Sequence, residues 1–108
     1  GRDAVVTIGE ALDAFDAEVA EPMALTPRTA YLRTTRLLRM QLGDRVDDPR
    51  DALTADDLRA FVVWHRAHGF SDDAEGTRKA AVHIARLGAW LDLSVSRDEL
   101  RALAPDGA

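Results

Sequence analysis

Four arginines lie in one predicted helical segment, residues 27–42, that contains no acidic residue. At 100° per residue, Arg28, Arg36 and Arg39 fall within about 80° of one another, and Arg33 lies at the margin of this group. The result is a basic stripe about 16 Å long on the outer face of the helix. Guanidinium groups bind phosphates bidentately and read guanine in the major groove. The stripe is therefore a candidate surface for nucleic acid.

A second, weaker basic set is predicted on a later helix. Arg78, Lys79, His83 and Arg86 all fall outside the apolar face of that helix, and Trp90 lies near the same polar side. The alternative for both sets is the ordinary solvated face of an amphipathic helix. On residues 27–42 every charge is positive, so nucleic-acid contact and an ordinary solvated face are about equally supported there. The two interpretations are also equally supported on the later helix.

Other chemistry-bearing residues do not form a recognisable catalytic or metal site. His65 and His68 could share a metal with Asp72 or Asp73, but histidines near helix ends are more often solvated, so we predict no metal site. The sequence has no Gly-rich phosphate loop, no serine-nucleophile elbow and no clear acid and base pair. We therefore expect no cofactor and no small-molecule substrate.

Helix start and stop signals divide the chain into five predicted helices. A capping box from Thr7 to Glu10 begins a helix over residues 8–20, which Pro22 ends. Thr26 and Pro27 begin the next, which runs to Leu42 before Gly43. Three further helices are predicted: one from the cap at Thr54 to Gly69, one from Ser71-Asp72-Asp73 to about Asp92, and one over about 97–103 after the capping box Ser96-Arg97-Asp98-Glu99.

Each of the longer segments has one apolar face. The face of residues 27–42 contains Ala30, Tyr31, Leu37, Leu38 and Leu42, and that of the fourth helix contains Ala80, Ala81, Ile84, Leu87, Gly88 and Leu91. No segment shows a convincing alternating strand pattern. We predict an all-α fold, a small four- to five-helix bundle, with residues 1–108 as a single domain and its core over about 7–92.

Composition is that of an ordinary soluble domain, except for its charge. The 108 residues are 46% hydrophobic and 31% charged, with no cysteine. No apolar run approaches the roughly 20 residues of a membrane helix, so we expect a cytoplasmic protein without membrane contact. Fourteen basic against 19 acidic residues give a net charge of −5. This acidity argues against nucleic-acid binding, which usually goes with a basic chain.

Several motifs in order resemble the N-terminal core-binding, SAM-like domain of tyrosine recombinases and phage integrases, over roughly residues 7–91. The motifs are Ile8-Gly9-Glu10-Ala11-Leu12-Asp13-Ala14-Phe15, Thr26-Pro27-Arg28-Thr29, the stretch from Ala52 to Phe61, His68-Gly69-Phe70-Ser71, and Arg78-Lys79 followed by Ile84, Leu87 and Ala89-Trp90-Leu91. Two departures are visible. Arg33 stands where the family usually has a tyrosine, and Asp72-Asp73 adds a residue before the fourth helix.

The resemblance implies a helical module that grips one side of a recombination site in double-stranded DNA, with its second and fourth helices towards the major groove. The DNA contacts that it implies are Arg28, Thr29, Arg33, Arg36, Arg39, Arg78, Lys79, His83 and Arg86. It also implies contact with other recombinase protomers through the full-length protein. The parent protein would then be a site-specific recombinase that performs DNA integration or recombination.

Catalysis is not expected from this chain. His83-Ile84-Ala85-Arg86 matches the family's His-x-x-Arg pattern, but in the family that pattern lies in a separate catalytic domain, followed by a nucleophilic tyrosine. No tyrosine follows Arg86, and Tyr31 falls on a predicted core face. Because Gly1 stands in place of an initiator Met, we expect a fragment whose catalytic domain is absent.

The alternative function is an acidic helical protein–protein interaction domain without DNA binding, in which the tail from Leu93 to Leu103 would take part. The gene's continuation would discriminate between the two. A following domain with Arg, His-x-x-Arg and a late Tyr would favour the recombinase module, and a stop codon near Ala108 would favour the adaptor.

Overall fold

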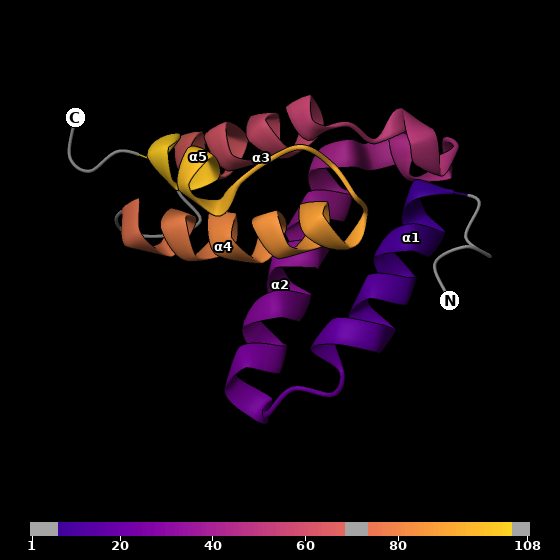
Figure 1. Cartoon of the computed structure of the whole chain (residues 1–108), viewed down its shortest axis with the longest axis horizontal. Coiled ribbons are helices and arrows are strands. Elements are labelled where there is room, and N and C mark those ends of the chain that lie inside the picture. The colour runs from indigo at the N-terminus through magenta and orange to yellow at the C-terminus, as the bar shows by residue number, and fades with distance from the viewer. Residues whose placement is uncertain (1–6, 69–73, 105–108) are drawn as a thin grey trace. The chain divides into compact units, whose positions relative to one another are not determined.

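A computed structural model describes residues 7–68 and 74–104 (Figure 1). Within these residues the regular secondary structure is helical, and the only β-type pairing is an isolated bridge between Thr7 and Pro49. The predicted all-α class is confirmed. The chain divides into two compact units, Gly1–Leu53 and Thr54–Ala108, which are described one at a time. The single domain over residues 1–108 stays a prediction.

The first unit begins with a helix that changes its hydrogen-bonding pattern near its end. Helix α1 spans Ile8–Phe15, and its first turn is capped by the Thr7 hydroxyl, which accepts a hydrogen bond from the Glu10 backbone N–H. A π-helical segment, η2, continues it over Asp16–Ala20. There the Glu21 N–H donates to the Asp16 carbonyl at 2.8 Å, five residues back. The predicted bounds of 8–20 are therefore correct, but the last turn is wider than an α-turn.

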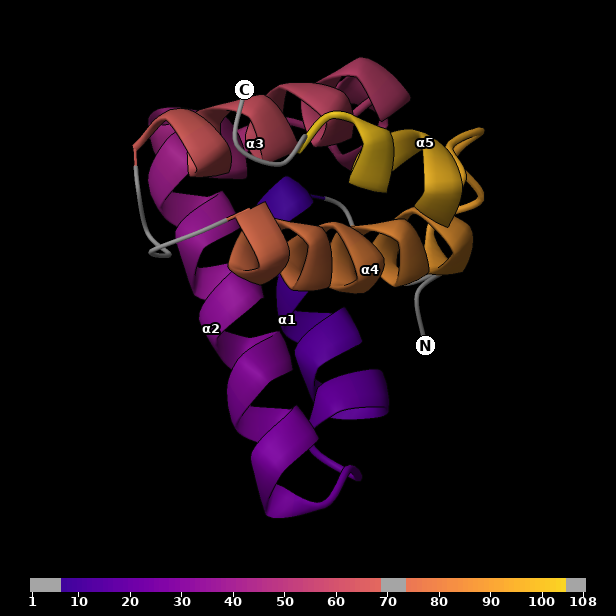
Figure 2. The same ribbon diagram turned by 90° about the vertical axis from the view of Figure 1, so that its left-hand side faces the viewer.

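Helix α2 spans Leu25–Leu42, so it begins two residues before the predicted start. Ala24, not Thr26, is the N-cap residue, and the Arg28 N–H makes the first backbone bond, to the Ala24 carbonyl at 3.0 Å. Pro27 is thus the third helical residue. Its missing N–H costs nothing there because the first N–H groups of a helix have no partner within it. Figures 1 and 2 show α1 and α2 as two neighbouring helices of the first unit, joined by a short turn.

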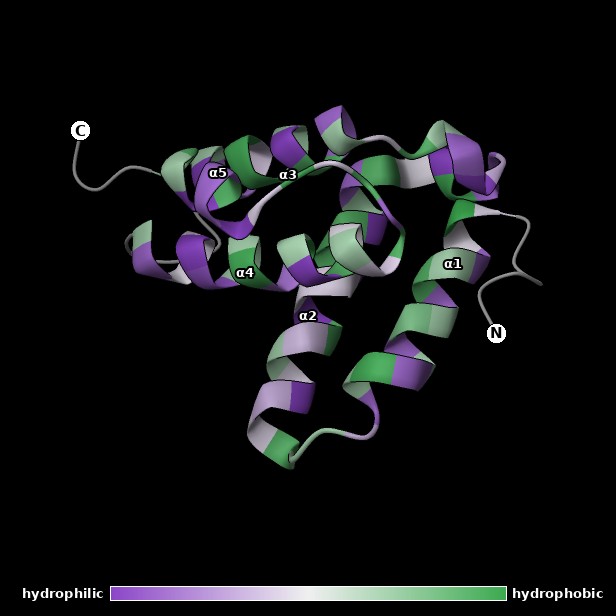
Figure 3. Ribbon diagram, in the orientation of Figure 1, coloured by the Kyte–Doolittle hydropathy of each residue, from purple (hydrophilic) through white to green (hydrophobic). Residues whose placement is uncertain are grey.

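Helices α1 and α2 each bury one apolar face, and that of α2 agrees with the predicted one. Ile8, Leu12 and Phe15 are fully buried, and the Phe15 ring lies 6.4 Å from that of Tyr31 between centroids. Tyr31, Leu37, Leu38 and Leu42 are buried on α2, and Ala30 is half-buried. Figure 3 shows hydrophobic and hydrophilic residues alternating around both helices, as this burial on one side requires.

Short 3₁₀ segments close the first unit. Helix α2 ends at Gly43, whose φ of 59° lies in the left-handed region that glycine adopts without strain. The segments η3, Gly43–Asp47, and η4, Arg50–Ala52, follow. The Ile8 N–H donates to the Asp48 carbonyl at 3.0 Å, which fastens the start of α1 to the connection between η3 and η4.

The second unit contains helices α3, Ala55–Ala67, α4, Ala74–Trp90, and α5, Arg97–Ala102. Capping boxes at Thr54 and Ser96 begin α3 and α5 as predicted. The predicted stop at Gly69 and start at Ser71-Asp72-Asp73 lie outside the described residues. The predicted core face of α4 is confirmed, because all six of its residues are buried: Ala80, Ala81, Ile84, Leu87, Gly88 and Leu91.

Helix α4 stops two residues before the predicted Asp92. Asp92 has a φ of 62°, and the Leu93 N–H donates to the Gly88 carbonyl at 2.8 Å while the Asp92 N–H donates to the Ala89 carbonyl at 3.1 Å. These bonds form a Schellman motif with an aspartate, instead of the usual glycine, in the left-handed position. The turn reverses the chain, and α5 packs against α4.

Candidate nucleic-acid interface

The outer face of α2 carries three arginines, of which two are well exposed. Arg33 and Arg36 are exposed, as is Thr29, and Arg28 is half-buried. Thr29, Arg33 and Arg36 lie opposite the buried Leu38, as the periodicity predicts, and Arg28 lies between that outer face and the buried side. Within the described chain, the side chains of Arg28 and Arg36 make no hydrogen bond or ion pair. The face therefore presents two guanidinium groups, those of Arg28 and Arg36, that no side chain of residues 7–68 and 74–104 neutralises.

Arg39 belongs to the same predicted stripe but is held by carboxylates of the first helix. Its Nη2 donates to Asp13 Oδ1 and Asp16 Oδ2, each at 2.8 Å, and only 28% of its side chain is exposed. The Thr35 hydroxyl also donates to Asp16, at 2.8 Å. Arg39 therefore fastens α2 to α1 and η2. Its charge is already balanced before any ligand arrives.

The basic residues of α4 also fall into an exposed group and a half-buried group. Lys79 and Arg86 are exposed. Arg78 is half-buried: its Nη2 donates to Glu75 Oε2 at 2.8 Å, and its Nη1 donates to the Ala104 carbonyl at 3.3 Å. Arg78 therefore fastens the chain after α5 to α4. Lys79 and Arg86 are therefore the exposed members of the four predicted residues.

His83 is the fourth predicted residue on α4, and it is half-buried. Burial lowers the pKa of its imidazole to about 4. At neutral pH the ring is therefore uncharged, so it can exchange hydrogen bonds with a ligand but contributes no positive charge. The basic character of this face depends on Lys79 and Arg86.

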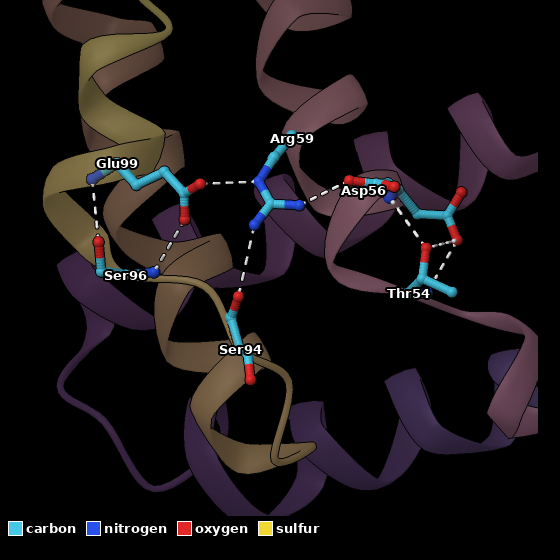
Figure 4. Close-up of polar contacts among 7 residues, drawn as sticks. Thr54, Asp56, Arg59, Ser94, Ser96 and Glu99 are labelled. Atoms are coloured by element: carbon cyan, nitrogen blue, oxygen red, sulfur yellow. Dashed lines mark hydrogen bonds and ion pairs between the residues drawn. The ribbon is translucent and has the colours of Figure 1, made fainter.

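A polar cluster centred on Arg59 was not anticipated from the sequence (Figure 4). Arg59 lies on α3, and its side chain is only 34% exposed. Its Nε donates to Glu99 at 2.8 Å, its Nη1 to Asp56 at 2.6 Å and its Nη2 to the Ser94 carbonyl at 3.4 Å. This pairing raises the pKa of Arg59 and lowers that of Glu99. The cluster fastens α5 to α3, so Arg59 has a structural role.

His65 also differs from its expected position. It was predicted to be solvated at a helix end, yet only 4% of the residue is exposed. Its Nδ1 lies 2.8 Å from the Thr77 hydroxyl of α4, and its ring lies 5.8 Å from that of Phe61. Leu58, Phe61 and Val62 place it on the buried face of α3, because His65 follows Phe61 by four residues. His68, by contrast, is exposed.

The described residues offer neither a metal site nor a membrane span. In residues 7–68 and 74–104, no three histidine or acidic side chains gather closely enough to bind a metal ion. No helix in the same part of the chain combines the length and the apolar surface needed to cross a bilayer. Asp72 and Asp73, which were considered with His65 and His68 for a metal, lie outside the described residues. The exposed basic faces are therefore the features of the described chain that suggest binding.

Comparison with known proteins adds no assignment. No family model matches the chain, and no curated protein or solved structure matches it.

Proposed function

We propose that this chain is a DNA-binding module of a tyrosine-recombinase-like integrase, which grips duplex DNA through the outer face of α2. The observation that carries the proposal is the presence of unneutralised arginines, Arg28 and Arg36, on one face of a chain whose net charge is −5. An acidic protein that concentrates exposed arginines on a helix without a single carboxylate has a local positive field that opposes its overall charge. Phosphates are the ligands that suit this field and the forked geometry of guanidinium.

The contact set proposed from the structure is narrower than the set implied by the family resemblance. Arg28, Thr29, Arg33 and Arg36 contact DNA from α2, and Lys79 and Arg86 contact it from α4. Arg39 and Arg78 position helices through their carboxylate partners. Neutral His83 contributes at most a hydrogen bond.

The proposed module performs no chemistry itself. Its only tyrosine, Tyr31, is buried on α2, with its ring 6.4 Å from that of Phe15 between centroids. Strand cleavage would require a catalytic domain in the full-length recombinase, which would also bring protomers together on the DNA.

The salt dependence of duplex binding tests the proposal. Each phosphate neutralised by a cationic side chain releases condensed counterion, so Arg36→Ala should reduce the magnitude of the slope of log K against log salt by about 1. Affinity should fall alike for all duplex sequences. Fluorescence anisotropy with a labelled duplex at low salt measures both quantities.

Two control variants make the experiment specific. Arg101 is exposed on α5 and its side chain makes no hydrogen bond or ion pair within the described chain, so Arg101→Ala removes one arginine without touching either proposed face. Arg39→Ala should lower thermal stability, because it breaks two ion pairs, while changing the slope much less than Arg36→Ala does. Equal slope changes for Arg36→Ala and Arg101→Ala would refute the proposed interface.

A further inference from the structure

The two helices of the first unit carry opposite charges. Residues 8–21, which include α1 and η2, contain Glu10, Asp13, Asp16, Glu18 and Glu21 and no basic residue. Helix α2 contains four arginines and no acidic residue. The first unit is therefore a helical hairpin with an acidic arm and a basic arm.

Most of these charges are not paired within the hairpin. Arg39 with Asp13 and Asp16 makes the ion pairs described between the two arms. Glu18 and Glu21 are exposed and, in the described chain, have no side-chain hydrogen bond or ion pair. On the other arm, the side chains of the exposed Arg36 and the half-buried Arg28 also make no hydrogen bond or ion pair with the described residues. Each arm thus presents charge that a surface of opposite sign could neutralise.

The basic arm also exposes apolar side chains that a purely electrostatic surface does not require. Leu25 is 68% exposed and Met40 is 61% exposed, although both belong to α2. At 100° per residue they fall on the same side as Arg36, within about 60° of one another. Methionine and arginine are both enriched in protein–protein interfaces, and Met40 is exposed on the same side of α2 as Arg36.

We propose that this surface binds the acidic arm of a second copy of the same chain. A two-fold axis parallel to the helices would place the basic arm of each copy on the acidic arm of the other. Such an axis keeps every residue at its own height along the hairpin and sets α2 antiparallel to the partner copy's α1. The Arg39–Asp16 ion pair shows that this part of α2 lies level with the end of α1. Arg33 and Arg36 would then lie near Glu18 and Glu21 of the other copy.

The charge pattern favours a second copy over an unrelated partner, because the required acidic helix is already present in the chain. The ion pairs would be close to solvent, so the association is weak and depends on salt. It does not rest on DNA binding and is measured without nucleic acid. It also requires no catalytic domain, unlike the protomer contacts expected of a full-length recombinase.

Reciprocal charge reversal tests the pairing. Sedimentation velocity at low ionic strength should show dimer for the natural sequence and monomer at high salt. Arg33→Glu with Arg36→Glu should be monomeric, and so should Glu18→Arg with Glu21→Arg, since each places like charges in both contacts of a two-fold dimer. An equimolar mixture of the two double variants should dimerise again, because both contacts then join opposite charges.

Two further variants separate this pairing from general charge effects. Arg97→Glu with Arg101→Glu makes the same change in net charge on exposed residues of α5 and should leave the dimer intact. Met40→Gln should weaken dimerisation without altering charge. A monomeric natural chain at low salt, or a mixture of the double variants that stays monomeric although each is folded by circular dichroism, would overturn the proposal. Such a result would leave DNA or a different protein as the occupant of the face.

Discussion

The imidazole of His83 shows how one partly buried group links protonation to stability. Its pKa in the folded chain is about 4, because burial disfavours the charged form, whereas an unburied histidine has a pKa of 6.5. Between these two values the unfolded chain binds more protons than the folded chain. The free energy of unfolding therefore falls as the pH drops from about 6.5 towards 4, and this contribution is fully present above 6.5.

We predict that His83→Gln reduces the loss of stability between pH 7 and pH 5. The natural chain should lose more free energy of unfolding over this interval than the variant does, since glutamine does not titrate. Urea denaturation at the two pH values measures the difference, and an NMR titration should place the midpoint of His83 near 4. His68→Gln, at an exposed histidine, controls for the loss of an imidazole. An NMR midpoint near 6.5 would contradict the explanation.

The sequence predicts which arginines are exposed, but not which of them pair with carboxylates on another helix. Helical periodicity correctly predicted that Arg33 and Arg36 are exposed, because exposure on a helix follows from residue spacing. It did not predict that Arg39 pairs with Asp13 and Asp16, which lie 26 and 23 residues earlier. Spacing rules relate charges within one helix, and such a pair depends on how two helices pack. The same reason applies to Arg59 and Glu99.

At the scale of helices, capping chemistry located the starts of α1, α3 and α5, but not the start of α2 or the end of α4. Thr54 and Ser96 cap α3 and α5 as predicted, because a hydroxyl and a carboxylate three residues apart satisfy N–H groups locally. The start of α2 was misplaced because Pro27 is tolerated at any of the first helical positions. The end of α4 was misplaced because Asp92 adopts a left-handed conformation that few residues other than glycine adopt.

Helices α3 and α4 share a buried polar contact that should contribute to the stability of the second unit. The Thr77 hydroxyl is fully buried and lies 2.8 Å from Nδ1 of the buried His65. Thr77→Val keeps the shape of the side chain and removes this hydrogen bond, which leaves His65 without this partner. We predict a loss of about 1–3 kcal/mol in the free energy of unfolding.

Chemical denaturation of Thr77→Val and Thr77→Ser separates the hydrogen bond from the packing. Serine keeps the hydroxyl and loses one methyl group, so its cost is that of a small cavity. The imidazole signal of His65 should move in the NMR spectrum of Thr77→Val and stay close to its original position in that of Thr77→Ser. Equal stability of Thr77→Val and the natural chain would mean that the contact contributes nothing.

At the scale of the whole molecule, the decisive quantity is the distribution of charge and not its sum. The net charge of −5 argues against DNA binding, yet five of the 19 acidic residues lie in residues 8–21 and the described part of α2 has none. Repulsion between DNA and the acidic arm therefore opposes the attraction that α2 provides. Both act over distances comparable with the Debye length, which is about 10 Å at 0.1 M salt.

This opposition predicts that neutralising part of the acidic arm strengthens DNA binding. Glu18 and Glu21 are exposed and hold no basic partner in the described chain, so Glu18→Gln with Glu21→Gln should leave the fold intact. A carboxylate about 12 Å from a phosphate in water costs about 0.3 kcal/mol, so removing two should raise duplex affinity about threefold at low salt. The double variant also removes acidic groups from the proposed dimer contact, and the loss of that contact also favours DNA binding.

Raising the salt to about 1 M should abolish the gain in duplex affinity, because the Debye length falls to about 3 Å. The slope of log K against log salt should change much less than in Arg36→Ala, since the same phosphates are contacted. Asp98→Asn, on α5, gives the background effect of losing one exposed carboxylate. A gain that persists at high salt would mean that the two glutamates act through the structure of the hairpin and not through their charge.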